Sequence, residues 1–482
     1  MKPFHYLHFL LPLALVACSA SAPAPAPAAP VRVERHAAAQ PAHRNLGPWV
    51  DAYVSGFGKH WGPAFRPRGY LIVARAGEPI LQRAYGDPAP DADTAFHIAS
   101  LTKQFTAVAV LRQVDAGKIS LDASVRSYLP DLPEALQPVT ITQLLHHTSG
   151  IADYTQSPKL EPLAKHPTPH AAVLELFVHQ PLAFPPGSKF DYSNSNYFLL
   201  GMVLEKVTSQ PYAALLKSQI LDPTGMTHSG ADGPTRRIDL AQGHSVHGAD
   251  QLVTAEPDDP SVAFSAGAIY TSASDLLKWD RALANGTLLS PRTETFRTTP
   301  AKGDYACGVV MDSFQGVLYE VHSGAISGFD ADLVRVPERD LLIAFLGNND
   351  GFDSSRITRK VLKMILTERP EAPIEERPLG HFDATAGEGV VGDYRLTAAS
   401  RQALRGKLPD PVVEGVSVAE VAIERDGLRV THAGERPFHL FPAVVSNTYF
   451  TKGSGIEVRF GQAGFVLRQA GFELQYERAD SH

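Results

Sequence analysis

Strand-like sequence stands at both ends of one long segment of this chain, and helix-like sequence lies between them. Residues 70–74 (YLIVA) and 79–85 (PILQRAY) have the composition of strands and are separated by a short turn. Helical patterns dominate the stretch from Leu101 to about Leu221. The runs that follow are strand-like at 308–311, 331–336 and 341–346, and helix-like at 360–367. This order predicts one α+β domain whose sheet is built from both ends of the segment.

A second domain is predicted after residue 378. Residues 370–378 (PEAPIEERP) have the composition of a linker. Beyond them, Asp426-Gly427 separates two strand-like runs in the manner of a β-hairpin. Apolar and polar residues alternate over 472–477 (FELQYE), as a half-buried strand requires. Residues 379–482 are therefore expected to form a small all-β, barrel-like domain.

The first 44 residues are expected to lie outside the folded body. Lys2 and the apolar run 9–17 (FLLPLALVA) are typical of a secretory signal peptide over residues 1–17. Residues 15–18 (LVAC) resemble the bacterial lipobox, which implies cleavage before Cys18 and acylation of its thiol. Ordinary cleavage near residues 20–22 is the alternative, and Pro23 disfavours it. By resemblance to Gram-negative lipoproteins, Ser19 favours the outer membrane, with the protein facing the periplasm.

Composition restricts the partners of the folded body. Residues 18–44 are Ala/Pro-rich at their start and predict a tether, which at ~3 Å per residue could span several nanometres. The net charge of −7 offers no basic surface for nucleic acid. The chain has two cysteines, and if Cys18 carries lipid then Cys307 has no partner within the chain. Cys307 is expected to be a small buried residue. Membrane contact is expected through the lipid anchor alone, and the sequence does not indicate an oligomeric state.

Ser100 and Lys103 stand three residues apart at the predicted start of a helix (SLTK). Leu101, Phe105, Val108 and Leu111 would share one face of that helix. At this spacing the lysine amine can approach the serine hydroxyl and take its proton. The Ser100 N–H could stabilise a developing oxyanion. The alternative is a serine N-cap beside a solvated lysine, and the motif alone favours that alternative.

Two further motifs change this interpretation. Residues 192–194 (YSN) and 322–324 (HSG) follow Ser100 in order, the second next to strand-like sequence. In this order they resemble the penicillin-recognising serine hydrolases: class C β-lactamases, DD-peptidases and related esterases. Connecting stretches resemble the same family, namely 144–151 (LLHHTSGI), 184–187 (FPPG), 197–201 (YFLLG), 221–226 (LDPTGM) and 265–275 (SAGAIYTSASD). The resemblance covers about residues 48–368 and implies, over 45–369, an antiparallel sheet flanked by helices plus an all-helical subdomain.

The resemblance implies an acyl-enzyme mechanism without cofactor or metal. Ser100 would attack a carbonyl, and both Lys103 and Tyr192 need their pKa values tuned to accept its proton near neutral pH. In the class C pattern the Tyr192 phenolate is the favoured base, and Lys103 supports it. Asn194 could bind Lys103 and the substrate amide. The alternatives are a structural tyrosine and a turn asparagine.

The third motif is expected to contact the substrate. His322 stands where many relatives carry lysine, and its imidazole could bind a substrate carboxylate or the tyrosine oxygen. This difference argues against true β-lactamase activity. Ser323 belongs to the same substrate-binding motif, and Gly324 would let the substrate backbone approach the strand. The Ala325 N–H is the expected second oxyanion donor.

Two other features could be mistaken for sites. Residues 243–248 (GHSVHG) approximate the Gly-x-Ser-x-Gly elbow around Ser245, but the second glycine comes one residue late. His146-His147 is a pair of residues that metals often bind, but the sequence offers no third ligand with suitable spacing, and we expect His147 to be structural. The C-terminal domain resembles the lipocalin-like domains of some relatives through residues 392–394 (GDY).

These observations predict a serine hydrolase acting on a small-molecule or peptide substrate. A peptide or amide bearing D-amino acids, such as a cell-wall stem peptide, is the first hypothesis. An esterase on small acyl esters is the second. A penicillin-binding sensor with negligible turnover is the third, and a catalytically dead scaffold is disfavoured by the complete motif set.

Overall fold

The computed structural model describes residues 45–60, 63–231, 239–247, 251–371, 379–405, 410–424, 427–432, 438–451, 456–469 and 472–479. The predicted signal peptide, the tether with Cys18, and positions 372–378 of the predicted linker lie outside the described residues. The described chain divides into two compact units, the first ending within the predicted linker and the second following it. Within the described ranges, we find no helix with the length and apolar character needed to span a bilayer.

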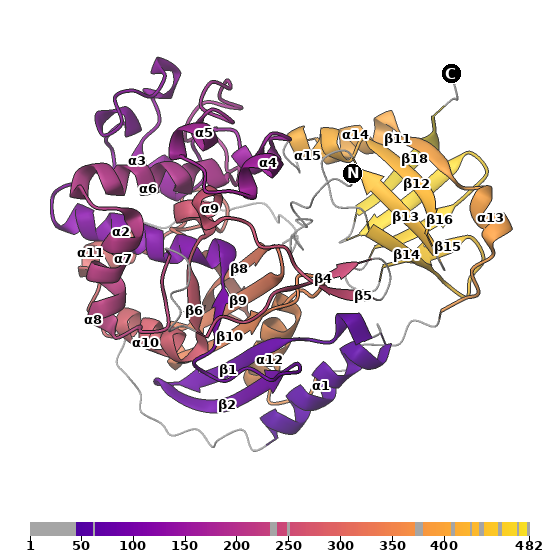
Figure 1. The fold of residues 1–482 in the computed structure, drawn as a ribbon, viewed down its shortest axis with the longest axis horizontal. Coiled ribbons are helices and arrows are strands. Elements are labelled where there is room, and N and C mark those ends of the chain that lie inside the picture. The colour runs from indigo at the N-terminus through magenta and orange to yellow at the C-terminus, as the bar shows by residue number, and fades with distance from the viewer. Residues whose placement is uncertain are drawn as a thin grey trace. The chain divides into compact units, whose positions relative to one another are not determined.

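The first unit is built on a six-stranded antiparallel sheet in the order β2-β1-β10-β9-β8-β7 (Figure 1). The first strand of the chain pairs with the last one of the sheet, from Gly69 opposite Gly347 to Arg75 opposite Leu341. The sheet is therefore built from both ends of the segment, as the sequence predicted. The strands are β1 (Gly69–Arg75), β2 (Glu78–Tyr85), β7 (Val310–Phe314), β8 (Val317–Ile326), β9 (Phe329–Val336) and β10 (Leu341–Gly347).

Each face of the sheet supports its own apolar core. On one face, α1 (Leu46–His60) and α12 (Ser355–Thr367) cover side chains that include Val321, Val334 and Ile343. On the other face, a larger core joins Ile72 and Leu333 to the remaining helices. Successive strand residues point to opposite faces. In β8 the odd-numbered residues, such as Val321, therefore face α1 and α12, and the even-numbered residues face the larger core.

The helical part lies between β2 and β7 in sequence. Its longer helices are α2 (Thr102–Asp115), α6 (Asn194–Thr208), α9 (Pro260–Gly267), α10 (Ala273–Ala284) and α11 (Pro291–Arg297). Its shorter helices are α3 (Ile141–Leu145), α4 (Leu160–Ala164), α5 (His170–Leu174), α7 (Tyr212–Leu216) and α8 (Asp222–Thr224). Two small two-stranded sheets accompany them: β3 (Ala95–His97) with β6 (Tyr270–Ser272), and β4 (His244–His247) with β5 (Gln251–Thr254).

Helix α2 is more deeply buried than its sequence predicted. The expected apolar face is present, since Leu101, Phe105, Val108 and Leu111 are all buried. The polar residues Thr102, Gln104 and Thr106 are buried as well, because α6, α9 and α11 pack around the helix. The hydroxyl of Thr106 donates to the carbonyl of Ser265 on α9 at 2.7 Å. A helix enclosed on all sides gives its side chains few alternative positions, which suits a helix that carries a reactive group.

The second unit is a closed eight-stranded antiparallel barrel, in agreement with the predicted fold class. Its strands are β11 (Gly392–Leu396), β12 (Val418–Glu424), β13 (Gly427–His432), β14 (Phe438–Pro442), β15 (Thr448–Phe450), β16 (Glu457–Phe460), β17 (Gly464–Gln469) and β18 (Phe472–Arg478). The predicted hairpin pairs Ile423 with Leu428, and the predicted alternation places Leu474 and Tyr476 inside. Three short helices were not predicted: α13 (Ala384–Glu388), α14 (Ala398–Leu404) and α15 (Asp410–Gly415).

Candidate active site

Ser100 lies in a tight helical turn, Ala99–Leu101, that runs directly into α2. Ala99, just before it, has a φ of +44°, a left-handed conformation that alanine rarely adopts. Ala99 and Leu101 are buried, whereas Ser100 is partly exposed. The N-cap position of α2 is Leu101, and no side chain makes a cap hydrogen bond there. The structure therefore excludes the alternative that Ser100 is an N-cap, and the strained turn leaves Ser100 only partly buried.

Lys103 is fully buried one turn along α2 and points at Ser100. Its Nζ donates to Ser100 Oγ at 3.0 Å, to Asn194 Oδ1 at 2.8 Å and to the carbonyl of Ala266 at 2.9 Å. Burial lowers the pKa of Lys103 from its ordinary 10.5 to about 7, although the carboxylate of Asp153 opposes this shift. An amine with this pKa is partly unprotonated at neutral pH, so it can accept a proton from the hydroxyl that it contacts.

Tyr192 lies beside the lysine, on the loop that leads into α6. The Nζ of Lys103 is 5.0 Å from the centre of its ring. Among the described residues, the Tyr192 phenol oxygen has no hydrogen-bond partner at ordinary distance. Burial raises the pKa of Tyr192, and the Ser100 hydroxyl close by lowers it by a smaller amount. The phenol therefore keeps its proton at neutral pH in this state of the site.

His147 fixes the segment that carries Tyr192. The two rings pack at 4.3 Å between centroids. The Ser193 N–H donates to His147 Nδ1 at 3.2 Å, and the Asp191 N–H donates to the His147 carbonyl at 2.8 Å. His147 is fully buried, and burial lowers its pKa well below the usual value. The histidine is therefore a neutral positioning residue, consistent with the structural role that the sequence predicted.

Asn194 links the lysine to an acidic residue that sequence reasoning missed. While its Oδ1 accepts from Lys103, its Nδ2 donates to Asp153 Oδ2 at 3.0 Å. Burial raises the pKa of Asp153, and the Lys103 charge lowers it by a smaller amount. In sequence Asp153 has only the pattern of a turn residue, and it does accept the Thr155 N–H at 3.0 Å. Nothing in the sequence shows that Asp153 also acts on the charge of Lys103.

Gly324 of β8 allows the Ser100 turn to approach the sheet. A Cβ added to Gly324 would lie 2.2 Å from the Ile98 carbonyl oxygen and 2.7 Å from the Ser100 nitrogen. The sequence assigned this space to the substrate backbone, and that expectation needs correction, because the protein's own turn fills it. Ala325 follows directly on β8, so its backbone lies beside the nucleophile turn.

Ser323 points to the opposite face of the sheet. Its hydroxyl donates to Asp332 Oδ1 at 2.6 Å, and Asp332 is also bound by Thr358 and Arg359 of α12. This orientation follows from the alternation of β8, which places residues 322 and 324 on the Ser100 face. The Ser323 side chain is therefore not available to a substrate at Ser100, which leaves only its backbone for the predicted role.

His322 shares the Ser100 face of β8 and contacts a tyrosine that sequence reasoning also missed. Its Nε2 lies 3.1 Å from the Tyr305 phenol oxygen, and its Nδ1 lies 2.6 Å from the Ser323 carbonyl. Burial first, and then the Lys103 charge, lower the pKa of His322 to about 3. Tyr305 lies in the segment just before β7, three residues before Gly308. Nothing in that stretch of sequence indicates a contact with His322.

The site therefore brings together Ser100 from the turn before α2, Lys103 from α2, Tyr192 and Asn194 from the segment where α6 begins, and His322 from β8. Comparison with known proteins gives this arrangement a family. The family model described as Beta-lactamase matches residues 59–366, more than half of the chain. The chain belongs to the β-lactamase family of serine hydrolases.

Relatives of this β-lactamase-family protein include penicillin-binding proteins. It is 24% identical over 454 residues to "Penicillin-binding protein 4*" of Bacillus subtilis, a match that covers 85% of this chain and 94% of the relative. It is 30% identical over 243 residues to "Putative penicillin-binding protein PbpX" of the same organism, over 48% of this chain and 59% of the relative.

Solved structures share the fold. The octameric penicillin-binding protein homologue from Pyrococcus abyssi superposes with a TM-score of 0.60 at 21% identity, covering 90% of this chain and 100% of that chain. D-amino acid amidase from Ochrobactrum anthropi SV3 gives a TM-score of 0.57 at 23% identity, covering 67% of this chain and 100% of that chain. At these identities the likeness concerns the fold alone.

The remaining candidates of this β-lactamase-family chain are structural. Ser245 lies inside strand β4, not on a strand-to-helix elbow, and its hydroxyl donates to Asp350 Oδ2 at 2.6 Å. Within the described ranges, no cluster of three or more His, Cys, Asp or Glu side chains could hold a metal ion. Cys307 is buried with its Sγ 3.7 Å from His146 Nε2, as a small core residue would be.

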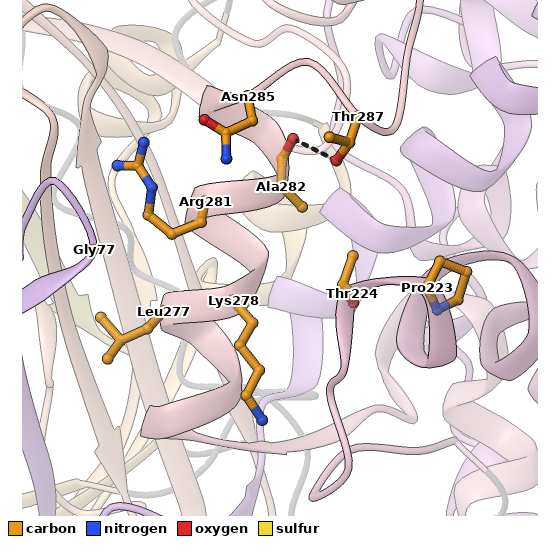
Figure 2. A pocket seen from close by; sticks show the side chains of 9 residues that line it. All are labelled: Gly77, Pro223, Thr224, Leu277, Lys278, Arg281, Ala282, Asn285 and Thr287. Atoms are coloured by element: carbon orange, nitrogen blue, oxygen red, sulfur yellow. Dashed lines mark hydrogen bonds between the residues drawn. The ribbon is translucent and has the colours of Figure 1, made fainter.

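A surface pocket of about 350 Å³ lies along α10, away from the predicted site residues (Figure 2). Two cations line it, but both have structural partners. Lys278 donates to the carbonyl of Gly225 at 2.7 Å and to Asp275 at 2.7 Å. Arg281 pairs with Asp340 at 3.4 Å. The pocket offers no nucleophile with a neighbouring base, so it does not compete with Ser100 as the reaction site.

Proposed function

We propose that this β-lactamase-family hydrolase cleaves peptides or amides that contain D-amino acids, through an acyl-enzyme on Ser100. The observation that carries the proposal is the 3.0 Å contact between Lys103 Nζ and Ser100 Oγ, made by a fully buried lysine whose pKa is lowered to about 7. The structural likeness to a D-amino acid amidase and to a D-stereospecific amidohydrolase from Streptomyces supports the substrate class at the level of fold.

In the proposed reaction, Lys103 is the base of the first step. The Ser100 hydroxyl gives its proton to the unprotonated amine, and Oγ attacks the substrate carbonyl. The sequence pattern favoured a Tyr192 phenolate for this step. We instead assign the proton acceptance to Lys103, because burial raises the pKa of the phenol and lowers that of the amine. The tetrahedral oxyanion would lie between the backbone N–H groups of Ser100 and Ala325.

Tyr192 is proposed as the proton donor to the leaving group. Its phenol carries a proton and lies near the Ser100 hydroxyl, which lowers its pKa against the larger effect of burial. The phenol would protonate the leaving nitrogen, and the Lys103 ammonium would restore the phenol. Deacylation would use the same groups in reverse, with water giving its proton to the pair and attacking the ester carbonyl. Asn194 would hold the lysine in place and offer a contact to the substrate amide.

A substrate panel tests the proposal. Purified protein is incubated with D-alanyl peptides, D-amino-acid amides, short acyl esters and nitrocefin, and Ser100→Ala is compared with Ser245→Ala, which alters the other candidate serine. We expect turnover of the D-amino-acid substrates, lost in Ser100→Ala and retained in Ser245→Ala. Turnover restricted to esters would replace the proposal with the esterase alternative. Activity that survives Ser100→Ala would reject the nucleophile.

The penicillin-sensor alternative has its own measurement. Intact mass spectrometry after brief mixing with a penicillin detects an adduct on Ser100. An adduct that persists, in a protein that turns over none of the panel, would favour the sensor. A short-lived adduct, or none, together with amide turnover supports the hydrolase.

We further propose that the protein is an envelope lipoprotein of the outer membrane, anchored through Cys18 and facing the periplasm. The support is the sequence of residues 1–18 alone. Intact mass of the membrane fraction from an expressing Gram-negative host should show a diacylglyceryl-type addition that Cys18→Ser abolishes. Recovery of unmodified wild-type protein cleaved near residue 20 would reject the anchor.

A further inference from the structure

Both ring nitrogens of His322 are engaged within the protein. Nδ1 lies 2.6 Å from the Ser323 carbonyl oxygen, which can only accept, so Nδ1 carries a proton. Nε2 lies 3.1 Å from the phenol oxygen of Tyr305. In the neutral ring Nε2 has a lone pair and accepts the Tyr305 O–H. The two hydrogen bonds together select one tautomer and one ring orientation.

We propose that Tyr305 is a positioning residue that keeps His322 neutral, so that the site accepts substrates presenting an amide or ester to β8 rather than a carboxylate. This inference rests on the proposed function and narrows its substrate class. It also revises the expectation that His322 binds a substrate carboxylate.

The charges around His322 favour the neutral ring. From α2 it faces the amine of Lys103, and from α12 the guanidinium of Arg359 acts on it through space. The other titratable groups near it are Tyr192, Tyr305 and His147, which are buried and uncharged at neutral pH. The carboxylate of Glu320, on the same face of β8, is bound by Arg297 and Arg335 and is therefore committed to other cations. Only 7% of His322 is exposed, so water does little to stabilise a charge.

Tyr305 is held firmly enough to act in this way. It is buried, and its ring meets the edge of His147 at 4.7 Å between centroids. Gly308, with a φ of +73°, lets the segment approach α2, because a Cβ there would lie 2.6 Å from the Lys103 carbonyl. The segment that carries Tyr305 is therefore packed closely against helix α2.

A carboxylate bound at Nε2 would require two unfavourable changes. The ring would have to take up a proton beside Lys103, and the hydrogen bond between the Tyr305 O–H and Nε2 would break. A neutral amide or ester group does not require the ring to take up a proton. The site therefore discriminates by the cost of charging His322, in addition to any contact that it offers to the favoured substrate.

A matched substrate pair tests the inference. N-acetyl-D-alanyl-D-alanine and its C-terminal amide share one scissile peptide bond, and mass spectrometry of the released D-alanine or D-alaninamide compares that cleavage directly. The pH dependence that Lys103 gives to cleavage is the same for both substrates, so it divides out of the acid-to-amide ratio of kcat/KM. For wild type we expect the amide to be preferred, with a ratio that changes less than twofold from pH 8 to pH 5.

Tyr305→Phe removes the O–H donor and leaves Nε2 able to take up a proton. We expect the acid-to-amide ratio of this variant to exceed that of wild type at least fivefold at pH 5. Tyr128→Phe, whose phenol accepts the Ser120 N–H away from the site, should keep the wild-type ratio. A wild-type ratio that rises tenfold towards low pH with a midpoint near 6.5, or a Tyr305→Phe ratio equal to that of wild type, would overturn the inference.

A second readout does not depend on turnover. In ¹⁵N-histidine-labelled protein, with His322→Asn for assignment, the His322 signals should remain those of the neutral Nδ1–H tautomer from pH 5 to pH 8. Imidazolium signals above pH 6 would reject the inference. If neither peptide is cleaved, the proposed substrate class fails, and the NMR result still decides the state of His322.

Discussion

Gly324 and Ser100 meet backbone to backbone, since a Cβ on Gly324 would lie 2.7 Å from the Ser100 nitrogen. This contact joins two segments more than two hundred residues apart and sets the proposed oxyanion donor of Ser100 beside strand β8. The glycine is required here for space, because any side chain would push the turn away from the strand.

Gly324→Ala should therefore lower kcat/KM by roughly 100-fold or more, the scale of losing one oxyanion donor. The same overpacking should cost about 1–3 kcal/mol of stability. Gly461→Ala in the barrel, where the nearest atom would be 3.7 Å away, is the matched control and should leave the activity unchanged. Steady-state kinetics and urea unfolding measure both effects, and a fully active Gly324→Ala would contradict the proposed geometry.

The pH profile should report Lys103. Its pKa is about 7 in the folded protein, so kcat/KM should rise with pH through an apparent pKa near 7 as the amine becomes a base. The ordinary value for lysine is 10.5. The unfolded chain therefore binds more protons between about pH 7 and 10.5, and this group makes the protein more stable as pH rises through that window. Lys103→Met should be inactive and should lose that part of the pH dependence. A rising limb centred above pH 9 would contradict the assignment of the base.

Asp153 should set the position of that limb. Its carboxylate raises the pKa of Lys103 against the effect of burial. Asp153→Asn keeps an oxygen to accept the Asn194 amide but removes the charge, so the limb should move to lower pH. Asp131→Asn, which alters an exposed carboxylate, should leave the limb in place. Profiles measured at constant ionic strength decide the matter, and an unmoved or alkaline-shifted limb in Asp153→Asn would reject the coupling.

The sequence carried the main parts of this site because each lies in a short motif. Ser100 and Lys103 are fixed to one helix turn, and the motifs around Tyr192 and His322 each begin or belong to a regular element. Tyr305 and Asp153 could not be predicted, because their roles depend on loops whose paths are set by tertiary packing. The proposed chemistry required the pKa values of Lys103 and Tyr192 to be tuned, but the degree of burial depends on how α6, α9 and α11 pack around α2. The pKa values that decide the chemistry arise from that burial.

The final prediction concerns the charges beneath the site. Glu320 lies on the same face of β8 as His322 and is bound by Arg297 of α11 at 2.9 Å and by Arg335 of β9 at 3.0 Å. All three side chains are buried, and Arg335 also binds Asp280 of α10 at 2.7 Å. This network joins the strand to two helices, and its residues are scattered through the sequence.

Glu320→Gln removes one charge and leaves each buried guanidinium with a single carboxylate partner, Arg297 with Glu294 and Arg335 with Asp280, so it should lower the free energy of unfolding by about 1–3 kcal/mol. The two arginines hold the pKa of Glu320 below its usual value although burial opposes them. Because the folded pKa is lowered, this stabilisation is present above the unfolded pKa and is lost as pH falls through the folded one. Glu338→Gln, which alters a half-exposed side chain, should change stability by no more than about 0.5 kcal/mol. Urea unfolding at pH 7 and at pH 3.5 checks both statements. The difference in free energy of unfolding between wild type and Glu320→Gln should be smaller at pH 3.5. A larger difference at pH 3.5 would contradict the stabilising role of the Glu320 carboxylate.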